Sequence, residues 1–374
     1  MSFKTVLASF SLIGTIIGAG IFAIPYVIIQ SGLAPVIFYF ILLTLVVLTT
    51  HLLFGEIVLR TKGKHRLVGY AQKYLGQKAK HILGVVVLIN TIGSLLVYLI
   101  LSGEFLKLIS ADLFGGANGV LIAWALYSVL IFFGLKAVSF SEFAMDLAMF
   151  IIGFLIIGLC LPHIGLANAP LSVPRNLFLP FGIILFSLTG MSAIPEAANI
   201  LGGKKGLKLA IISAILVCSL FTLLFGLAVA LTSGQNTTQE GLVGLKPILG
   251  DNILIFGGIF GFLSVATSFL IIGHYLKNTF ELDYGFNKLA AFLVVCFAPL
   301  VLFLAGLRHF VAVIAILGAF SGTIEGIAVV FIYLKAKKNG DQQPSYNLRI
   351  PKIILGFIIA ILCLGALLQI IYGN

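Results

Sequence analysis

Glycine collects in the middle of one long apolar stretch, SLIGTIIGAGIFAIPYVIIQSG, at residues 11–32. Gly14, Gly18 and Gly20 fall within seven residues there, and Pro25 follows. Each Gly costs a helix about 1 kcal/mol relative to Ala, and non-helical backbone survives at membrane depth only where protein or a water-filled cavity surrounds it. The pattern predicts an interrupted helix that frames a binding site. Close helix packing through the spacing of Gly14 and Gly18 is the alternative.

A second stretch, LFSLTGMSAIPE at residues 185–196, repeats this order of small residues followed by proline. Four small or hydroxyl-bearing residues stand together before Pro195, namely Ser187, Thr189, Gly190 and Ser192. Transporters with inverted repeats often carry two such interruptions in matching positions. The pair of stretches therefore favours a binding site over packing alone.

Two broken helices offer a defined chemistry. The half-helix that begins after a break points free N–H groups into the cavity, and these attract a carboxylate. The half that ends before the break leaves carbonyl oxygens, which suit a cation or an ammonium group. A small zwitterion is the ligand that this combination predicts.

Composition indicates the elements that hold these residues. Of 374 residues, 60% are hydrophobic and only 9% are charged, which leaves too few polar side chains for the surface of a soluble protein. Apolar segments of about 20 residues can each cross roughly 30 Å of hydrocarbon. We predict an all-α polytopic membrane protein, one transport domain over residues 1–374, with about eleven transmembrane helices at 5–31, 34–59, 81–109, 119–136, 141–162, 177–201, 207–232, 249–278, 288–306, 309–334 and 352–372.

Basic residues alternate between the two sides of this arrangement. Of the 23 Lys and Arg, all except Lys107, Arg175, Lys246 and Arg308 fall on the side of the N-terminus. Basic loops stay in the cytoplasm, so we predict a protein of the plasma membrane with the N-terminus inside and the C-terminus outside. The same rule explains the net charge of +11 without a nucleic-acid partner.

The two interruptions lie five segments apart, and an odd number of crossings inverts the second unit relative to the first. We therefore predict inverted repeats at residues 5–162 and 177–334, with a final helix at 352–372.

Two motifs also carry a family likeness. GTIIGAGIFAIP resembles the first-helix signature of the amino acid/polyamine/organocation superfamily, which has the LeuT-type fold. TSFLIIGHYLKNTFELDYG, at residues 267–285, resembles the eighth helix of the aromatic amino acid permeases and their auxin-permease-like relatives. The likeness spans essentially the whole chain. It implies two five-helix inverted repeats plus one helix, with the first and sixth helices broken.

The resemblance also implies roles for individual residues. Backbone groups of the first break would bind the substrate carboxylate, and these belong to Ile17, Gly18, Ala19 and Gly20. Six further residues would hold the amino group or line the side-chain pocket, namely Phe186, Ser187, Thr189 and Met191 of the sixth helix and Tyr98 and Ser102 of the third. An anchor at the membrane interface is the alternative role for Tyr98.

A cation site is implied as well. In sodium-coupled members of the fold, adjacent hydroxyls on the eighth helix join carbonyl groups of the first break around Na⁺. The matching groups are the hydroxyls of Thr267 and Ser268 and the carbonyls of Gly14 and Ile17, an all-oxygen set that suits a hard cation. Hydroxyls bonded back to their own helix are the alternative. The fifth-helix lysine of some proton-coupled relatives has no counterpart, but several proton-driven aromatic permeases keep a similar eighth helix. Na⁺ and H⁺ both stay candidates, with no other cofactor.

Carboxylates inside membrane segments are functional candidates. Glu325, in the middle of the tenth segment, is a candidate proton carrier, or else a structural partner of neighbouring hydroxyls. Glu196, just past the second break, lies where a cytoplasmic gate would close, and Lys4 is its expected partner.

No catalytic residue is predicted, because the six histidines are scattered and neither HExxH nor a phosphate-binding GxxxxGK[ST] occurs. We predict a cation-coupled symporter of neutral, hydrophobic or aromatic amino acids that works by alternating access, with the amino acid and membrane lipid as its partners. An amino acid exchanger or an uncoupled, channel-like facilitator is the alternative. The pattern predicts no oligomeric state.

Overall fold

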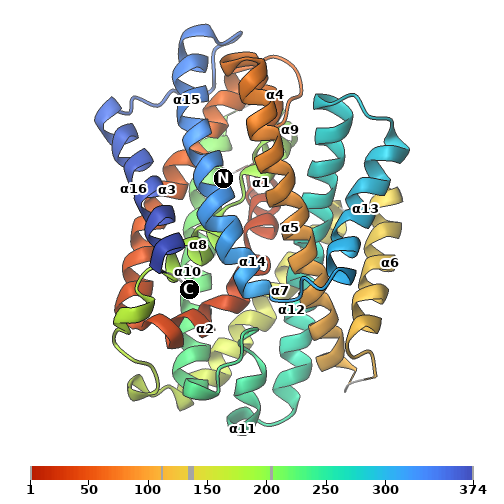
Figure 1. Ribbon diagram of the computed structural model, residues 1–374, viewed down its shortest axis with the longest axis vertical. Helices are drawn as coiled ribbons and strands as arrows, with labels where there is room; N and C mark the ends of the chain where they lie inside the picture. The colour runs from red at the N-terminus through yellow and green to blue at the C-terminus, as the bar shows by residue number, and fades with distance from the viewer. Residues whose placement is uncertain (1, 111–112, 134–138, 203–204, 373–374) are drawn as a thin grey trace.

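The computed structural model describes residues 2–110, 113–133, 139–202 and 205–372. They form a bundle of helices, most of which run along one long axis (Figure 1). Lys136 and Lys204, which the predicted charge alternation includes, lie outside the described residues. The described residues contain no β-strand.

The helices have the following bounds: α1 Phe3–Ile16, α2 Gly20–Ser31, α3 Leu33–Arg60, α4 Leu67–Leu75, α5 Gln77–Ile109, α6 Ala117–Phe133, α7 Ser139–Cys160, α8 Pro180–Leu188, α9 Ile194–Leu201, α10 Leu207–Ser233, α11 Lys246–Leu249, α12 Asn252–Asn278, α13 Lys288–Leu304, α14 Phe310–Ile316, α15 Thr323–Asn339 and α16 Lys352–Tyr372. A π-helical segment, Thr279–Asp283, follows α12. A second one, Leu317–Gly322, joins α14 to α15.

Local sequence explains several of these ends. The Ser2 side chain accepts the Thr5 N–H at 3.3 Å and so caps the start of α1. Pro180 and Pro195 stand in the first turns of α8 and α9, where the missing N–H of proline costs no helical hydrogen bond. Gly202 ends α9 with a φ of 63°, a left-handed conformation that glycine adopts without steric cost.

The multi-pass helical architecture is confirmed. Among the described residues, eight spans are long and apolar enough to cross a membrane, and the pair α1 and α2, bent by 52°, makes a ninth. The helices α6 and α13 are apolar but shorter, with 17 residues each. Each of the eleven predicted segments overlaps a span or one of these shorter helices. The count of eleven and the inverted repeats stay predictions.

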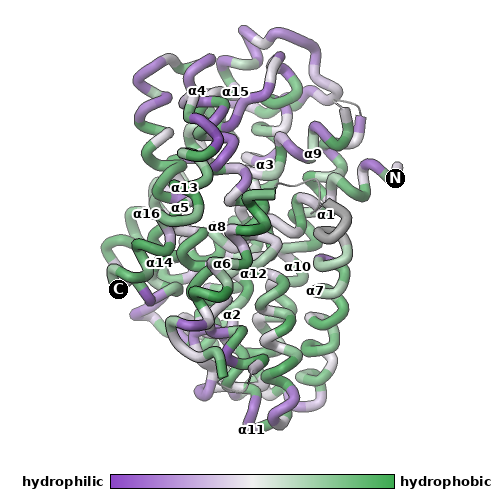
Figure 2. The backbone as a smooth tube through the Cα atoms, turned by 90° about the vertical axis from the view of Figure 1, so that its right-hand side faces the viewer, coloured by the Kyte–Doolittle hydropathy of each residue, from purple (hydrophilic) through white to green (hydrophobic). Residues whose placement is uncertain are grey.

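An apolar band surrounds the middle of the bundle, and hydrophilic residues gather toward its ends, most densely at the end with α4 and α15 (Figure 2). On α3, Phe38, Ile41 and Leu45 follow one another at helical spacing with 58%, 62% and 60% of their surface exposed. Large exposed apolar patches are rare on soluble monomers. Lipid tails would cover this row of side chains in a bilayer.

The interrupted helices lie inside the bundle. The protein buries 78% of an 18-residue apolar stretch of the span Pro180–Leu201, compared with 28% of such a stretch in Lys352–Tyr372. The helix α1 packs against α9, α10 and α12, while α2 packs against α8 and α10. This central position shields the irregular backbone from lipid, as its unpaired polar groups require.

Candidate functional site

The first predicted break is present at the expected residues. The helix α1 ends at Ile16, and Ile17 leaves the helical conformation with φ −81° and ψ 90°. Residues 17–19 are non-helical, and α2 begins at Gly20. The first N–H groups of α2 therefore have no partner within that helix, and they carry the positive end of its dipole.

The second predicted break is present as well. The helix α8 ends at Leu188, Thr189 is extended, and a short 3-10 turn, Met191–Ala193, leads into α9. The Gly190 N–H donates to Nε2 of the buried His51 at 2.9 Å. A histidine of α3 thus satisfies one backbone donor that the break would otherwise leave unpaired. The sequence contained His51 only as one of several scattered histidines, so this partner was missed.

The two breaks touch each other through glycine. A Cβ on Gly20 would lie 2.2 Å from the Ser187 Oγ and 2.6 Å from the Ser187 Cα. A Cβ on Gly190 would lie 2.4 Å from the Cγ1 of Ile16. Both distances are far below van der Waals contact, so only glycine permits this approach of the two interrupted helices.

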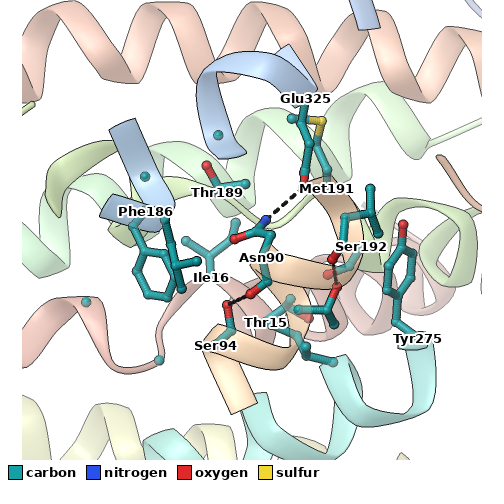
Figure 3. Close-up of a pocket in the computed structure, with 18 of the residues that line it drawn as sticks. Thr15, Ile16, Asn90, Ser94, Phe186, Thr189, Met191, Ser192, Tyr275 and Glu325 are labelled. Atoms are coloured by element: carbon teal, nitrogen blue, oxygen red, sulfur yellow. Dashed lines mark hydrogen bonds between the residues drawn. The ribbon is translucent and has the colours of Figure 1, made fainter. Parts of the chain in front are cut away.

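A cavity opens against both breaks (Figure 3). A water-sized sphere can reach about 60 Å³ of space inside it. The polar side chains in its wall come from α1, α5, the second break, α12 and α15, and they are Thr15, Asn90, Thr91, Ser94, Tyr98, Thr189, Ser192, Tyr275 and Glu325. Among the described residues that line the cavity, Glu325 is the one carboxylate.

Most of the predicted substrate residues lie in this wall, and three do not. Those that line the cavity are Gly18, Ala19, Gly20, Tyr98, Phe186, Thr189 and Met191. The Ser102 hydroxyl instead donates to the Tyr98 carbonyl and shares a 2.8 Å hydrogen bond with the Tyr127 hydroxyl. The Ser187 hydroxyl donates to the Ile183 carbonyl of its own helix at 2.6 Å. Ile17 is buried behind the break, where it contributes its carbonyl.

The structure brings three of the four predicted cation-site residues together. The Ser268 hydroxyl donates to the Gly14 carbonyl at 2.9 Å and reaches the Ile17 carbonyl at 3.4 Å. The Thr267 hydroxyl points elsewhere and donates to two carbonyls of α12 itself. The second hydroxyl at the break belongs to Ser264, which donates to the Ile17 carbonyl at 3.1 Å. Its spacing of four residues from Ser268 places both on one helix face.

A carboxylate lies beside this cluster. Asp146 of α7 is 1% exposed, and each of its carboxylate oxygens lies 2.7 Å from the position that a Cβ on Gly14 would occupy. The side chain of Asp146 therefore fills the space left by the missing side chain of Gly14. The carboxylate of Asp146 thus lies against the residue whose carbonyl accepts from Ser268.

Comparison with known proteins identifies the family of the chain. A model of the tryptophan/tyrosine permease family matches residues 1–369. The chain belongs to this family. It is therefore a membrane permease and not an enzyme.

A relative and a solved structure extend this assignment. The tyrosine-specific transport system 1 of Haemophilus influenzae is 24% identical over 361 residues, which cover 90% of each chain. The crystal structure of MhsT in complex with L-phenylalanine matches with a TM-score of 0.71 and 13% identity, over 100% of this chain and 99% of that one. The permease thus has the LeuT-type fold that its first-helix motif predicted.

The partner of Glu196 in this permease differs from the prediction. Arg66, 4% exposed in its side chain, forms an ion pair with Glu196, which is 35% exposed. Lys4, the predicted partner, is exposed. The Arg66 guanidinium also lies 5.8 Å from the ring centre of Tyr275, which lines the cavity. Arg66 was missed because it immediately precedes α4, in a loop that looked like any basic cytoplasmic loop.

Proposed function

We propose that this permease moves an aromatic amino acid, tyrosine or tryptophan, across the plasma membrane by alternating access. The cavity that lies against both helix breaks carries the proposal. The family description includes tryptophan and tyrosine, and the Haemophilus influenzae relative bears the name of a tyrosine-specific system. The MhsT complex contains phenylalanine in a protein of the same fold. These names support an aromatic substrate.

The amino acid backbone would bind at the breaks. Gly18, Ala19 and Gly20 line the cavity at the start of α2, where free N–H groups and the helix dipole favour a carboxylate. Thr189 and Ser192 face the same space from the second break. The carbonyl ends of α1 and α8 suit the substrate ammonium group.

We propose that the coupling cation binds between α1, α7 and α12. The carbonyls of Gly14 and Ile17 meet the hydroxyls of Ser264 and Ser268 there, and Asp146 brings a carboxylate against Gly14. An all-oxygen set with one negative charge suits a hard monovalent cation such as Na⁺ better than a soft metal. Because the carbonyls belong to the break that also binds substrate, cation binding would order the substrate site.

A proton on Glu325 is the competing coupling ion. Glu325 is 6% exposed and lines the cavity from α15. Carboxylates in such positions occur in the proton relays of transporters. The cation cluster and Glu325 can be separated by mutation.

We also propose that the N-terminus lies in the cytoplasm and the C-terminus outside. The distribution of Lys and Arg in the sequence supports this orientation. In a cysteine-free background, an impermeant thiol reagent added to intact cells should label Tyr372→Cys and not Ser2→Cys. The reverse pattern would overturn the orientation.

The test of function is uptake of labelled tyrosine into proteoliposomes under an imposed Na⁺ or H⁺ gradient. Na⁺-driven accumulation that is lost in Ser268→Ala would support the cation cluster. The matched control is Ser219→Ala, which removes a buried hydroxyl on α10 that bonds Thr44, and it should accumulate tyrosine normally. H⁺-driven accumulation that is lost in Glu325→Gln would assign coupling to Glu325 instead. Exchange without accumulation under either gradient would contradict coupled symport.

A further inference from the structure

A hydrogen-bonded pair stands in the cavity wall away from the first break. Asn90 of α5 donates from Nδ2 to Oε1 of Glu325 of α15 at 2.9 Å, and both residues line the cavity (Figure 3). The Ser94 hydroxyl donates to the Asn90 carbonyl at 2.8 Å. The pair therefore links α5 to α15, and the Ser94 hydroxyl bonds the backbone of Asn90 within α5.

The position of this pair relative to the first break follows from α5. The Tyr98 hydroxyl lies 3.1 Å from the position that a Cβ on Gly18 would occupy, so Tyr98 borders the break. Asn90 precedes Tyr98 by eight residues, which corresponds to about 12 Å along the helix axis. A small amino acid held at the break would end short of Asn90, whereas an extended aromatic side chain would reach toward it.

The cavity wall near the pair suits a flat ring. The π-helical segment between α14 and α15 contributes Leu317, Gly318 and Gly322. The two glycines present no side chain, and Phe186 of α8 also lines the cavity. A largely apolar wall with a few polar groups is typical of small-molecule sites, where the polar groups fix orientation.

The pair has acceptor capacity to spare. The Asn90 amide uses a donor toward Glu325, which leaves the side-chain oxygen of Asn90, Oδ1, and the second carboxylate oxygen of Glu325, Oε2, for a ligand. Both atoms accept hydrogen bonds. The phenol of tyrosine offers an O–H and the indole of tryptophan offers an N–H, while phenylalanine offers no donor at its tip.

We propose that Asn90 and Glu325 read the tip of the substrate side chain, and select aromatic amino acids that carry a hydrogen-bond donor there. This inference rests on the proposed function, because it needs the amino acid backbone at the helix breaks. A site built to bond a substrate O–H or N–H rejects analogues that lack it, since its own buried polar groups are then left unpaired.

The first test uses the unmodified protein and near-isosteric ligands. Equilibrium binding to purified permease compares tyrosine with 4-fluorophenylalanine, and tryptophan with its benzothiophene analogue, in which sulfur replaces the N–H. We expect each donor-bearing ligand to bind about tenfold more tightly, because an analogue without the donor leaves a buried acceptor unpaired. A ratio near one for both pairs would overturn the proposal, whatever the variants show.

Two variants locate the preference. Glu325→Gln replaces one carboxylate oxygen by an amide nitrogen, and Asn90→Leu removes the partner that positions Glu325. Each should lower the tyrosine preference to about threefold or less. Asn199→Leu is the matched control, because Asn199 also donates to a glutamate, Glu196, but lies outside the cavity wall. It should keep the wild-type ratio.

The outcomes separate this inference from the proposed function. Equal weakening of tyrosine and 4-fluorophenylalanine in Glu325→Gln would assign Glu325 to the ammonium group or to coupling and overturn tip recognition. Absence of binding for every aromatic amino acid would contradict the proposed function itself.

Discussion

The contact between Gly20 and Ser187 makes a sharp prediction about the two breaks. In Gly20→Ala, the new methyl group would lie 2.6 Å from the Ser187 Cα, about 1 Å inside the favourable carbon–carbon separation of roughly 3.5 Å. Rotation of a side chain cannot relieve a contact with backbone, so α2 and α8 must separate. Overpacking of this kind costs about 1–3 kcal/mol, and the backbone clash places Gly20→Ala at the upper end.

The expected consequences of Gly20→Ala are a lower melting temperature and weaker transport. For a chain of 374 residues, about 3 kcal/mol lowers Tm by about 4 °C. A shift near 1 Å in the groups that hold the substrate costs about 100-fold in kcat/KM. Fluorescence of the single tryptophan, Trp124, follows unfolding in detergent, and proteoliposome uptake of tyrosine measures transport.

The control for Gly20→Ala is Gly158→Ala. A Cβ at Gly158, on α7, would meet no atom within 4 Å, so this variant should melt at or slightly above the wild-type temperature, since Ala favours a helix over Gly. If Gly20→Ala matched the wild type in both Tm and tyrosine uptake, direct packing of the two breaks would be refuted.

Two further predictions concern charged groups near the α4 end of the bundle. Glu196→Gln removes the ion-pair partner of the buried Arg66 and should destabilise the protein by about 2 kcal/mol, less than the loss of a fully buried pair, because Glu196 is 35% exposed. Thermal melts should show this loss but no loss in Asp251→Asn, whose ion pair is exposed. A hydrogen bond from Lys73 lowers the pKa of Asp341 from its usual 3.8, so its contribution is present above about pH 4 and is lost as pH falls through the lowered pKa. The Tm difference between wild type and Asp341→Asn should therefore be constant near neutral pH and vanish in acid, and a difference that grows in acid would contradict the ion pair.

The breaks could be predicted from local sequence because their causes are local. Glycine clusters and the prolines that follow them weaken a helix wherever they occur. The interruptions at residues 17–19 and at Thr189 and Gly190 were therefore placed correctly before any contact was known. The eighth-helix hydroxyls were placed less well, because adjacent residues on a helix point in directions about 100° apart. Ser268 faces the break, whereas Thr267 bonds its own helix.

Partners that come from distant parts of the chain were not predicted. Arg66 pairs with Glu196 across 130 residues, and Asn90 bonds Glu325 across 235. Asn90, Thr91, Ser94 and Tyr98 did carry a signal, since they form a polar stripe at helical spacing within an apolar segment. That stripe indicates that one face of α5 borders a polar cavity, but it does not show which other helix lies opposite that face.

Composition and periodicity alone were enough for the membrane class, the helical architecture and the location of both broken helices, because the bilayer forces every spanning segment to bond its own backbone. The family likeness in the first and eighth helices added the fold. Only the tertiary structure shows how each helix is rotated and that Gly20 contacts Ser187. It also shows that Asp146 lies against Gly14 and that Glu325 accepts from Asn90. Such features depend on which faces of separate helices meet, and that choice is made by close contact among residues far apart in the chain.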